Sequence, residues 1–140
     1  MASLKNYSFV RNGQLAGCAM PDDCSDTTDF IAREGFKTIV NLTEIAHPRA
    51  REFEERGIVA VHIPIADFQA PSLAQMHQFA SLVGDAARRP LLVHCRAGIG
   101  RTGTMLAVGC IALDQQATGG TCDADAVIRS VRMLRPGSLE

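Results

Sequence analysis

The chain has 140 residues, of which 46% are hydrophobic and 21% are charged, and its formal net charge is -1. These values are typical of one soluble globular domain, and they argue against a disordered chain and against a nucleic-acid partner recognised through bulk charge. The apolar runs are shorter than the ~20 residues of a membrane-spanning helix, and the first residues lack the apolar segment of a secretory signal. We therefore expect a single domain over residues 1–140, in a cytoplasmic protein that has no membrane partner and is a monomer by default.

The five cysteines form an odd set without a CxxC pair or a regular spacing. Neither a disulfide framework nor a zinc site with Cys and His ligands is therefore expected. Four of them are interpreted as free thiols in a reducing compartment, namely Cys18, Cys24, Cys110 and Cys122. The fifth, Cys95, differs because a polar loop that contains glycines follows it.

Short runs of β-branched and apolar residues predict five strands, over residues 7–10, 14–18, 38–42, 59–63 and 91–95. The first two are separated by Arg11-Asn12-Gly13, which is typical of a hairpin with a glycine in its turn. The last three runs are too short for core helices, so they are predicted to be buried strands.

Four helices are predicted between and after these strands, over residues 48–57, 72–86, 101–113 and 123–134. Ser72 and Gln75 form the sequence pattern of a capping box, and Asp123 is placed to cap the last helix. The helix that begins at Arg101 is apolar nearly all round, so it is expected to lie at the centre of the domain. Because strands alternate with helices, the chain is predicted to be an α/β domain with a central, mostly parallel β-sheet flanked by helices.

The stretch HCRAGIGRT, from His94 to Thr102, lies at the junction of a predicted strand and a predicted helix. Backbone N–H groups can converge on one phosphate there, and the start of the helix adds about half a positive charge. Gly98 and Gly100 matter because successive N–H groups point inward only where residues adopt unusual backbone angles or leave no side chain in the way. We therefore expect a phosphate-binding loop made of Arg96, Ala97, Gly98, Ile99, Gly100 and Arg101.

Cys95 lies at the base of this loop and is the predicted nucleophile. A helix N-terminus and neighbouring cations lower the pKa of a thiol from ~8.5 to roughly 3.5–7.5, so we expect a thiolate at neutral pH. Arg101 adds a planar guanidinium that can hold two phosphoryl oxygens through the transition state. Thr102 is expected to donate its hydroxyl to the sulfur. His94 is expected to hold the backbone of the loop rather than to carry a proton.

This loop resembles that of the protein tyrosine phosphatase superfamily. The extension GRTGTM, the earlier NLTE at 41–44 and the closing RPGS at 135–138 resemble the small atypical dual-specificity phosphatases and the related Cdc14-like enzymes. The resemblance covers nearly the whole chain, and it implies a protein tyrosine phosphatase-like fold with no metal or organic cofactor. Relatives usually continue into a further C-terminal helix, which the single domain is expected to lack.

The resemblance also places a proton donor on the loop after the strand that precedes the phosphate-loop strand. Asp67 is the only carboxylate of the corresponding segment, HIPIADFQAPS. It would protonate the leaving oxygen as an acid and then, as a base, activate the water that breaks the thiophosphate. The alternative is that Asp67 only solvates a turn, in which case the weaker candidates for the acid are Asp22, Asp23 and Asp26.

The resemblance implies hydrolysis of phosphate monoesters through a cysteinyl-phosphate intermediate, with phosphoproteins that carry phosphotyrosine, and also phosphoserine or phosphothreonine, as substrates. Phosphoinositide and RNA 5′-phosphatases use the same loop, but lipid-directed relatives usually carry extra lysines within it, whereas here Arg96 is the only basic residue between Cys95 and Arg101. A catalytically silent phosphate-binding module would be expected to lack Cys95, Arg101 or Asp67. A rhodanese-like sulfur carrier also uses a loop cysteine, although the placement of the arginine favours phosphate over persulfide.

Overall fold

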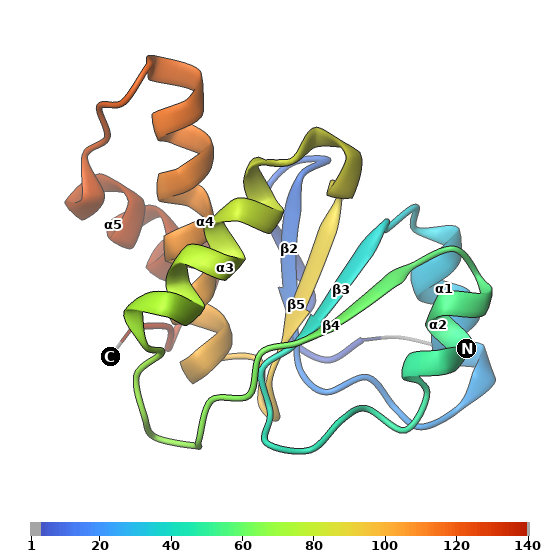
Figure 1. Ribbon diagram of the computed structural model, residues 1–140. Coiled ribbons are helices and arrows are strands. Elements are labelled where there is room, and N and C mark those ends of the chain that lie inside the picture. Colours follow the sequence, from blue (N-terminus) through green and yellow to red (C-terminus); the bar gives the residue numbers. More distant parts are fainter. Residues whose placement is uncertain (1–3, 140) are drawn as a thin grey trace.

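The computed structural model describes residues 4–139, which fold around one five-stranded sheet (Figure 1). The strands lie side by side in the order β1-β2-β5-β3-β4. Their bounds are β1 Ser8–Arg11, β2 Leu15–Cys18, β3 Thr38–Asn41, β4 Val59–His62 and β5 Leu91–His94. The β1–β2 pair is an antiparallel hairpin, whereas the pairs β2–β5, β5–β3 and β3–β4 are parallel. The predicted α/β class and the mostly parallel sheet are therefore confirmed.

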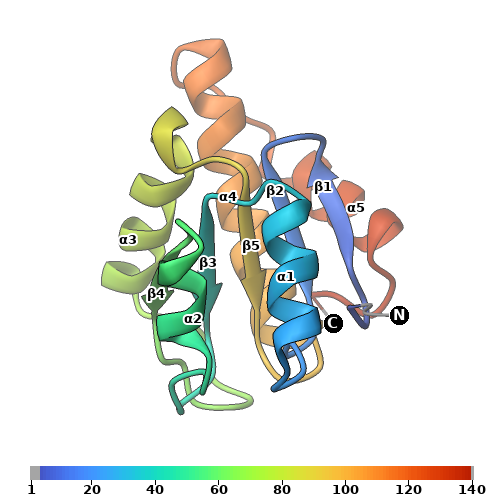
Figure 2. The same ribbon diagram turned by 90° about the vertical axis from the view of Figure 1, so that its right-hand side faces the viewer.

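Helices cover both faces of this sheet (Figure 2). Their bounds are α1 Ser25–Arg33, α2 Ala50–Glu55, α3 Leu73–Gly84, α4 Gly100–Thr118 and α5 Ala124–Leu134. One face packs against α1 and α2 through a cluster that contains Ile31, Ile39 and Phe53. The other face packs against α3, α4 and α5 through a larger cluster that contains Leu15 and Met105. The three inner strands β2, β5 and β3 are thus buried from two sides, which explains their mostly apolar sequences.

Two features differ from the sequence prediction. The strand β4 pairs only with β3 and its residues are exposed or half-buried, so the prediction of a buried strand is wrong there. An apolar run does not distinguish an edge strand from a central one. The helix α1 was not predicted, because its buried face is made of Thr27, Thr28 and Ile31. Threonine is a weak helix former and does not mark a buried face in the sequence.

The predicted caps and the central helix are confirmed. Ser72 and Gln75 form a complete capping box at the start of α3, and the Asp123 side chain accepts from the Ala126 N–H at the start of α5. In α4, a Cβ atom on Gly109 would lie 2.6 Å from Leu15 and 3.1 Å from Phe79, so the absence of a side chain lets this helix pack closely. Within residues 4–139, no helix combines the length and the apolarity needed to cross a membrane.

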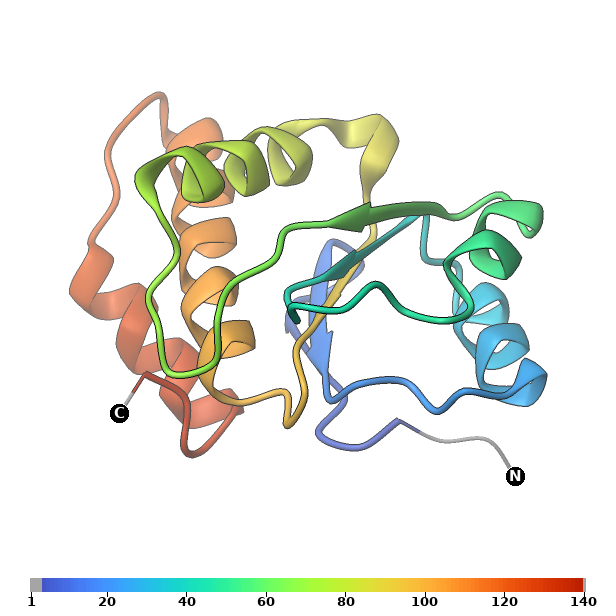
Figure 3. The same cartoon turned by 60° about the horizontal axis from the view of Figure 1, so that its bottom comes forward.

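The parallel strands β3, β4 and β5 end at the same edge of the sheet, because Asn41 pairs in register with both His62 and His94. The loops that follow them therefore lie together, and Figure 3 shows them on the side that faces the viewer. Ligand sites of open parallel sheets form at this edge, beyond the carboxyl ends of the strands. The fold thus brings the segments around Glu44, Asp67 and Cys95 to one place.

Candidate active site

A cavity of about 520 Å³ opens between the loop after β4 and the loop after β5. Its lining includes Cys95, Arg96 and Arg101 from the phosphate loop and Asp67 from the other loop. Among the residues that the structure describes, Asp67 is the one carboxylate that lines it. Asp22, Asp23 and Asp26 line no part of this cavity, so its geometry favours Asp67 over them.

Cys95 follows directly after β5 and is 3% exposed. The Gly98 N–H donates to its Sγ at 3.3 Å. Burial by itself would raise the pKa of this thiol, but the adjacent donor groups of Thr102 and Gly98 and the charge of Arg101 outweigh that effect and lower it. These neighbours therefore favour the thiolate form of Cys95 over the thiol. The other buried thiols behave in the opposite way, since burial raises the pKa of Cys110 to about 11.

The turn of the phosphate loop depends on Gly98. Its φ of +78° lies in the left-handed region, and a Cβ there would lie 2.5 Å from the backbone of Cys18 and Ala19. Only glycine fits this position. Gly100, which begins α4, has neither a positive φ nor a close neighbour, so the expected need for glycine is met at Gly98 and not at Gly100.

Arg101 lies in the first turn of α4 and its side chain is 5% exposed. Its Nη1 donates to the Ile65 carbonyl at 2.8 Å and to Glu44 Oε1 at 2.7 Å, and its Nη2 lies 3.5 Å from Asp67 Oδ1. The guanidinium therefore connects the loops that follow β3, β4 and β5. A cation held in this way is positioned at the cavity before any anion binds.

Glu44 belongs to the site, although sequence reasoning gave it no role. The hydrogen bond from Arg101 is the main cause that lowers the pKa of Glu44. Its loop is fixed by Asn41, whose Oδ1 accepts from the Thr43 N–H at 2.9 Å and from the Thr43 hydroxyl at 2.7 Å. The available signal was the NLTE motif itself, in which the Asn and the Thr shape the turn and the Glu reaches Arg101.

Asp67 projects from the more open side of the cavity. Its side chain is 48% exposed, and its Oδ1 accepts from the Phe68 N–H at 3.0 Å. Phe68 itself has a φ of +63° and is 96% exposed. The carboxylate thus lies at the solvent side of the cavity, beside the buried Arg101.

Thr102 and His94 lie behind the nucleophile. The Thr102 hydroxyl is buried and has no hydrogen-bond partner among the described residues, and it lies near enough to Cys95 to contribute to the lowered pKa of the thiol. His94 is fully buried, and its Nδ1 lies 3.3 Å from the Cys95 carbonyl oxygen. Burial lowers the pKa of His94 to about 3, so the ring is neutral at physiological pH. This agrees with a supporting role and not with proton transfer.

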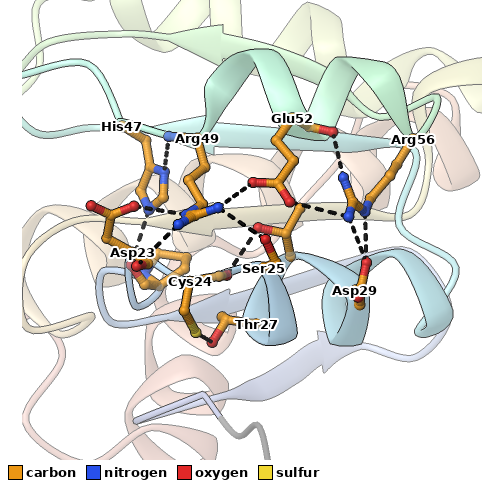
Figure 4. Close-up of polar contacts among 11 residues, drawn as sticks. Asp23, Cys24, Ser25, Thr27, Asp29, His47, Arg49, Glu52 and Arg56 are labelled. Carbon is orange, nitrogen blue, oxygen red and sulfur yellow. Dashed lines mark hydrogen bonds and ion pairs between the residues drawn. The ribbon is translucent and has the colours of Figure 1, made fainter.

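A polar network on the α1–α2 side supports the loop after β3 (Figure 4). The His47 ring stacks edge-on to His94 at 5.9 Å between centroids, and its Nδ1 accepts from the Arg49 N–H at 3.1 Å. Its Nε2 therefore carries the hydrogen and donates to the Pro21 carbonyl at 2.9 Å. The Arg49 guanidinium pairs with Asp23 at 2.7 Å and with Glu52 at 2.6 Å. These contacts hold the loop from outside and contribute no group to the cavity.

A profile of the family described as "Polymorphic toxin system, DSP-PTPase phosphatase" matches residues 16–115. This chain belongs to that family. The matched segment includes the loop that carries Asp67, the phosphate loop and most of α4. The resemblance to the protein tyrosine phosphatase superfamily that the sequence motifs indicated is thereby confirmed.

The chain is also similar to solved structures and to curated proteins. The active form of Tk-PTP is 31% identical with a TM-score of 0.76, and the alignment covers 96% of this chain and 88% of Tk-PTP. The tyrosine-protein phosphatase cdc-14 of Caenorhabditis elegans is 32% identical over 112 residues, which are 79% of this chain and 14% of that protein. The probable chloroplastic NAD kinase 2 of Oryza sativa subsp. japonica is 31% identical over 106 residues, or 71% of this chain. The chain spans about a tenth of that plant protein's length.

Proposed function

We propose that this chain hydrolyses phosphate monoesters through a cysteinyl-phosphate intermediate. The observation that carries the proposal is the meeting, in one cavity, of a thiol with a lowered pKa, a buried guanidinium and an exposed carboxylate. A nucleophile, an electrostatic anchor and a proton donor are the groups that this reaction needs.

In the first step, the Cys95 thiolate attacks phosphorus and forms the P–S bond while the ester P–O bond breaks. Asp67 gives its proton to the leaving oxygen, and the alcohol or phenol departs. Arg101 and the backbone N–H groups of the loop hold the other phosphoryl oxygens during the transfer. This arrangement supplies positive charge where negative charge is concentrated in the transition state.

In the second step, the Asp67 carboxylate takes a proton from water while the water oxygen attacks phosphorus. The P–S bond breaks, inorganic phosphate is released and Cys95 returns to its thiolate form. The Thr102 hydroxyl would stabilise the departing sulfur by a hydrogen bond. Asp67 is left protonated and is ready for the next substrate.

Phosphotyrosine, and also phosphoserine and phosphothreonine, on proteins are the proposed substrates. The cavity is lined by two cations, Arg96 and Arg101, and by the Asp67 carboxylate, while Glu44 pairs with Arg101. The site thus carries little net positive charge beyond what one phosphate requires. A polyanionic headgroup or a triphosphate would meet the two carboxylates without further lysines or arginines to balance its charge, so this balance supports a monoester.

The test compares wild-type protein with Cys95→Ser on p-nitrophenyl phosphate, phosphotyrosyl and phosphoseryl peptides and a soluble phosphoinositide. We expect turnover of the first two by the wild type, slower turnover of the phosphoseryl peptide, and a loss on the order of 10⁵-fold or more in the variant. The variant should still bind orthovanadate, because the loop that holds the anion is unchanged. Activity of Cys95→Ser within tenfold of the wild type would contradict the mechanism, and a preference for the phosphoinositide would contradict the substrate class.

A further inference from the structure

Three successive carbonyl groups of the phosphate loop accept hydrogen bonds from donors outside the loop. The Arg96 carbonyl accepts from the Met20 N–H at 3.0 Å, and the Ala97 carbonyl accepts from Asn6 Nδ2 at 2.7 Å. The Gly98 carbonyl accepts from Arg135 Nη2. None of these donors lies near the loop in the sequence, so the contacts are products of the tertiary fold.

The direction of these carbonyls determines the direction of the N–H groups. In a trans peptide the C=O and the following N–H point to opposite sides. Carbonyls drawn outward therefore turn the N–H groups of residues 97–99 toward the side of the nucleophile. One of these can be checked directly, because the peptide whose carbonyl binds Asn6 donates its Gly98 N–H to Cys95 Sγ at 3.3 Å.

Gly98 makes such outside support necessary. A glycine has no side chain to restrict its backbone, so the peptide planes on its two sides rotate at little cost. Their orientation then depends on the partners of their N–H and C=O groups. The sulfur of Cys95 holds one plane through the N–H, and Arg135 holds the other through the carbonyl.

Arg135 follows the last turn of α5 and is 6% exposed. Its Nη1 donates to the Asn6 carbonyl at 2.6 Å, to Ser8 Oγ at 2.7 Å and to the Gly17 carbonyl at 3.2 Å. Its partners among residues 4–139 are carbonyl and hydroxyl oxygens, without a carboxylate. A charged donor forms stronger hydrogen bonds than a neutral one, and three of these four bonds act on backbone carbonyls in or around the phosphate loop.

We propose that Arg135 and Asn6 are positioning residues that draw the Ala97 and Gly98 carbonyls outward and so keep the loop in its oxyanion-binding conformation before substrate arrives. This inference rests on the proposed function, because it concerns the loop that would hold the phosphoryl group. Neither residue touches the phosphate site. Their effect reaches it through the peptide planes alone, so that the N–H groups need no reorganisation during the reaction.

The test uses Arg135→Lys and Asn6→Gly, with Arg129→Lys on the exposed side of α5 as a matched control. A lysine keeps the charge but cannot span the carbonyls of Gly17 and Gly98 as the guanidinium fork does. Glycine at position 6 accepts the φ of +52° found there and removes the amide donor. Because Asn6 is exposed, its variant keeps the inference testable even if Arg135→Lys folds poorly.

Two readouts separate positioning from simple support of the fold. Calorimetry gives the affinity for orthovanadate, and mass spectrometry gives the pH at which iodoacetamide alkylates half of Cys95. We expect each variant to bind vanadate roughly tenfold or more weakly and to be alkylated at a higher midpoint pH, because fewer N–H groups face the anion and the thiolate. Arg129→Lys should match the wild type in both measurements.

Vanadate affinity within twofold of the wild type and an unchanged alkylation midpoint, in both variants, would overturn the inference. If the wild type also hydrolysed phosphate esters normally, that result would leave the proposed function intact. Wild-type protein that binds vanadate but hydrolyses no phosphate ester would contradict the proposed function alone, while the variants would still report on the loop. Wild-type protein that fails to bind vanadate would contradict both.

Discussion

The two loops that form the cavity differ in how firmly the rest of the protein holds them. In the phosphate loop, the Arg96, Ala97 and Gly98 carbonyls are bonded to distant parts of the fold, and Cys95 is almost fully buried. In the loop after β4, the Asp67 side chain is about half exposed. The anion site is therefore built in advance by tertiary contacts, whereas the proposed proton donor lies on a surface loop at its entrance.

Arg101 belongs to the phosphate loop, which the fold holds firmly. Its replacement should lower turnover more than any other substitution except loss of the nucleophile. We expect Arg101→Lys to lower kcat for p-nitrophenyl phosphate by roughly 10³–10⁵-fold, because an ammonium cannot hold two equatorial oxygens at once. The measurement is steady-state kinetics with Arg129→Lys as the control, since Arg129 is exposed on α5 and does not line the cavity. If Arg101→Lys kept most of its kcat, the role of the buried guanidinium proposed here would be wrong.

Asp67 belongs to the exposed loop after β4. The effect of replacing it on turnover should depend on the leaving group of the substrate. An acidic phenol leaves an aryl phosphate almost without protonation, whereas an alkoxide must be protonated as it leaves an alkyl phosphate. We expect Asp67→Asn to slow alkyl phosphates by up to about 10⁴-fold and to slow the release of activated phenols much less. In the pH profile of turnover, we assign the acidic limb to ionisation of Cys95 and the basic limb to loss of the Asp67 proton. The acidic limb should therefore persist in Asp67→Asn, while the basic limb flattens. Equal losses for all leaving groups would mean that Asp67 only holds its loop.

The burial of His94, next to the phosphate loop, can be tested by measuring stability rather than turnover. Its pKa is lowered to about 3, chiefly by burial, and the neighbouring His47 and His62 act in the same direction. Below about pH 6.5 the unfolded chain takes up a proton that the folded chain refuses, so the free energy of unfolding falls as pH falls. The slope should be about 1.4 kcal/mol per pH unit between the unfolded and folded pKa values.

The measurement for His94 is urea unfolding between about pH 6.5 and pH 4, where the histidine contribution is largest. His94→Asn should lose this part of the pH dependence, because asparagine does not titrate. His77→Asn serves as the control, since His77 is exposed on α3. An unchanged slope in His94→Asn would show that His94 is accessible to protons in the folded state.

The position of the phosphate loop between a strand and a helix was predictable from the sequence, because the loop is a short local motif. His94, Cys95, Arg101 and Thr102 are at most eight positions apart, and a strand and a helix fix their geometry. The partners that shape the motif were not predictable. Glu44 is 57 positions from Arg101, and Arg135 is 37 positions from Gly98. Contacts at such separations follow from topology, which one sequence does not specify.

The fold shows the same division between local and long-range information. The capping box at Ser72 and the cap at Asp123 are local patterns, and both form as predicted. The position of β4 at the edge of the sheet depends on strand order, which an apolar run does not encode. The helix α1 depends on burial of Thr27 and Thr28 against the sheet, where tertiary packing outweighs weak helix propensity.

The most direct test of the central claim is to trap the intermediate on Cys95. Asp67→Asn should release the phenol of an activated aryl phosphate quickly but hydrolyse the thiophosphate slowly, because the base for the second step is missing. Acid-quenched protein, digested and analysed by mass spectrometry, should then carry phosphate on the peptide that contains Cys95. The doubly substituted Cys95→Ser, Asp67→Asn protein should carry none on that peptide. Phosphate found on another residue, or a burst of phenol without any phosphorylated protein, would contradict the account.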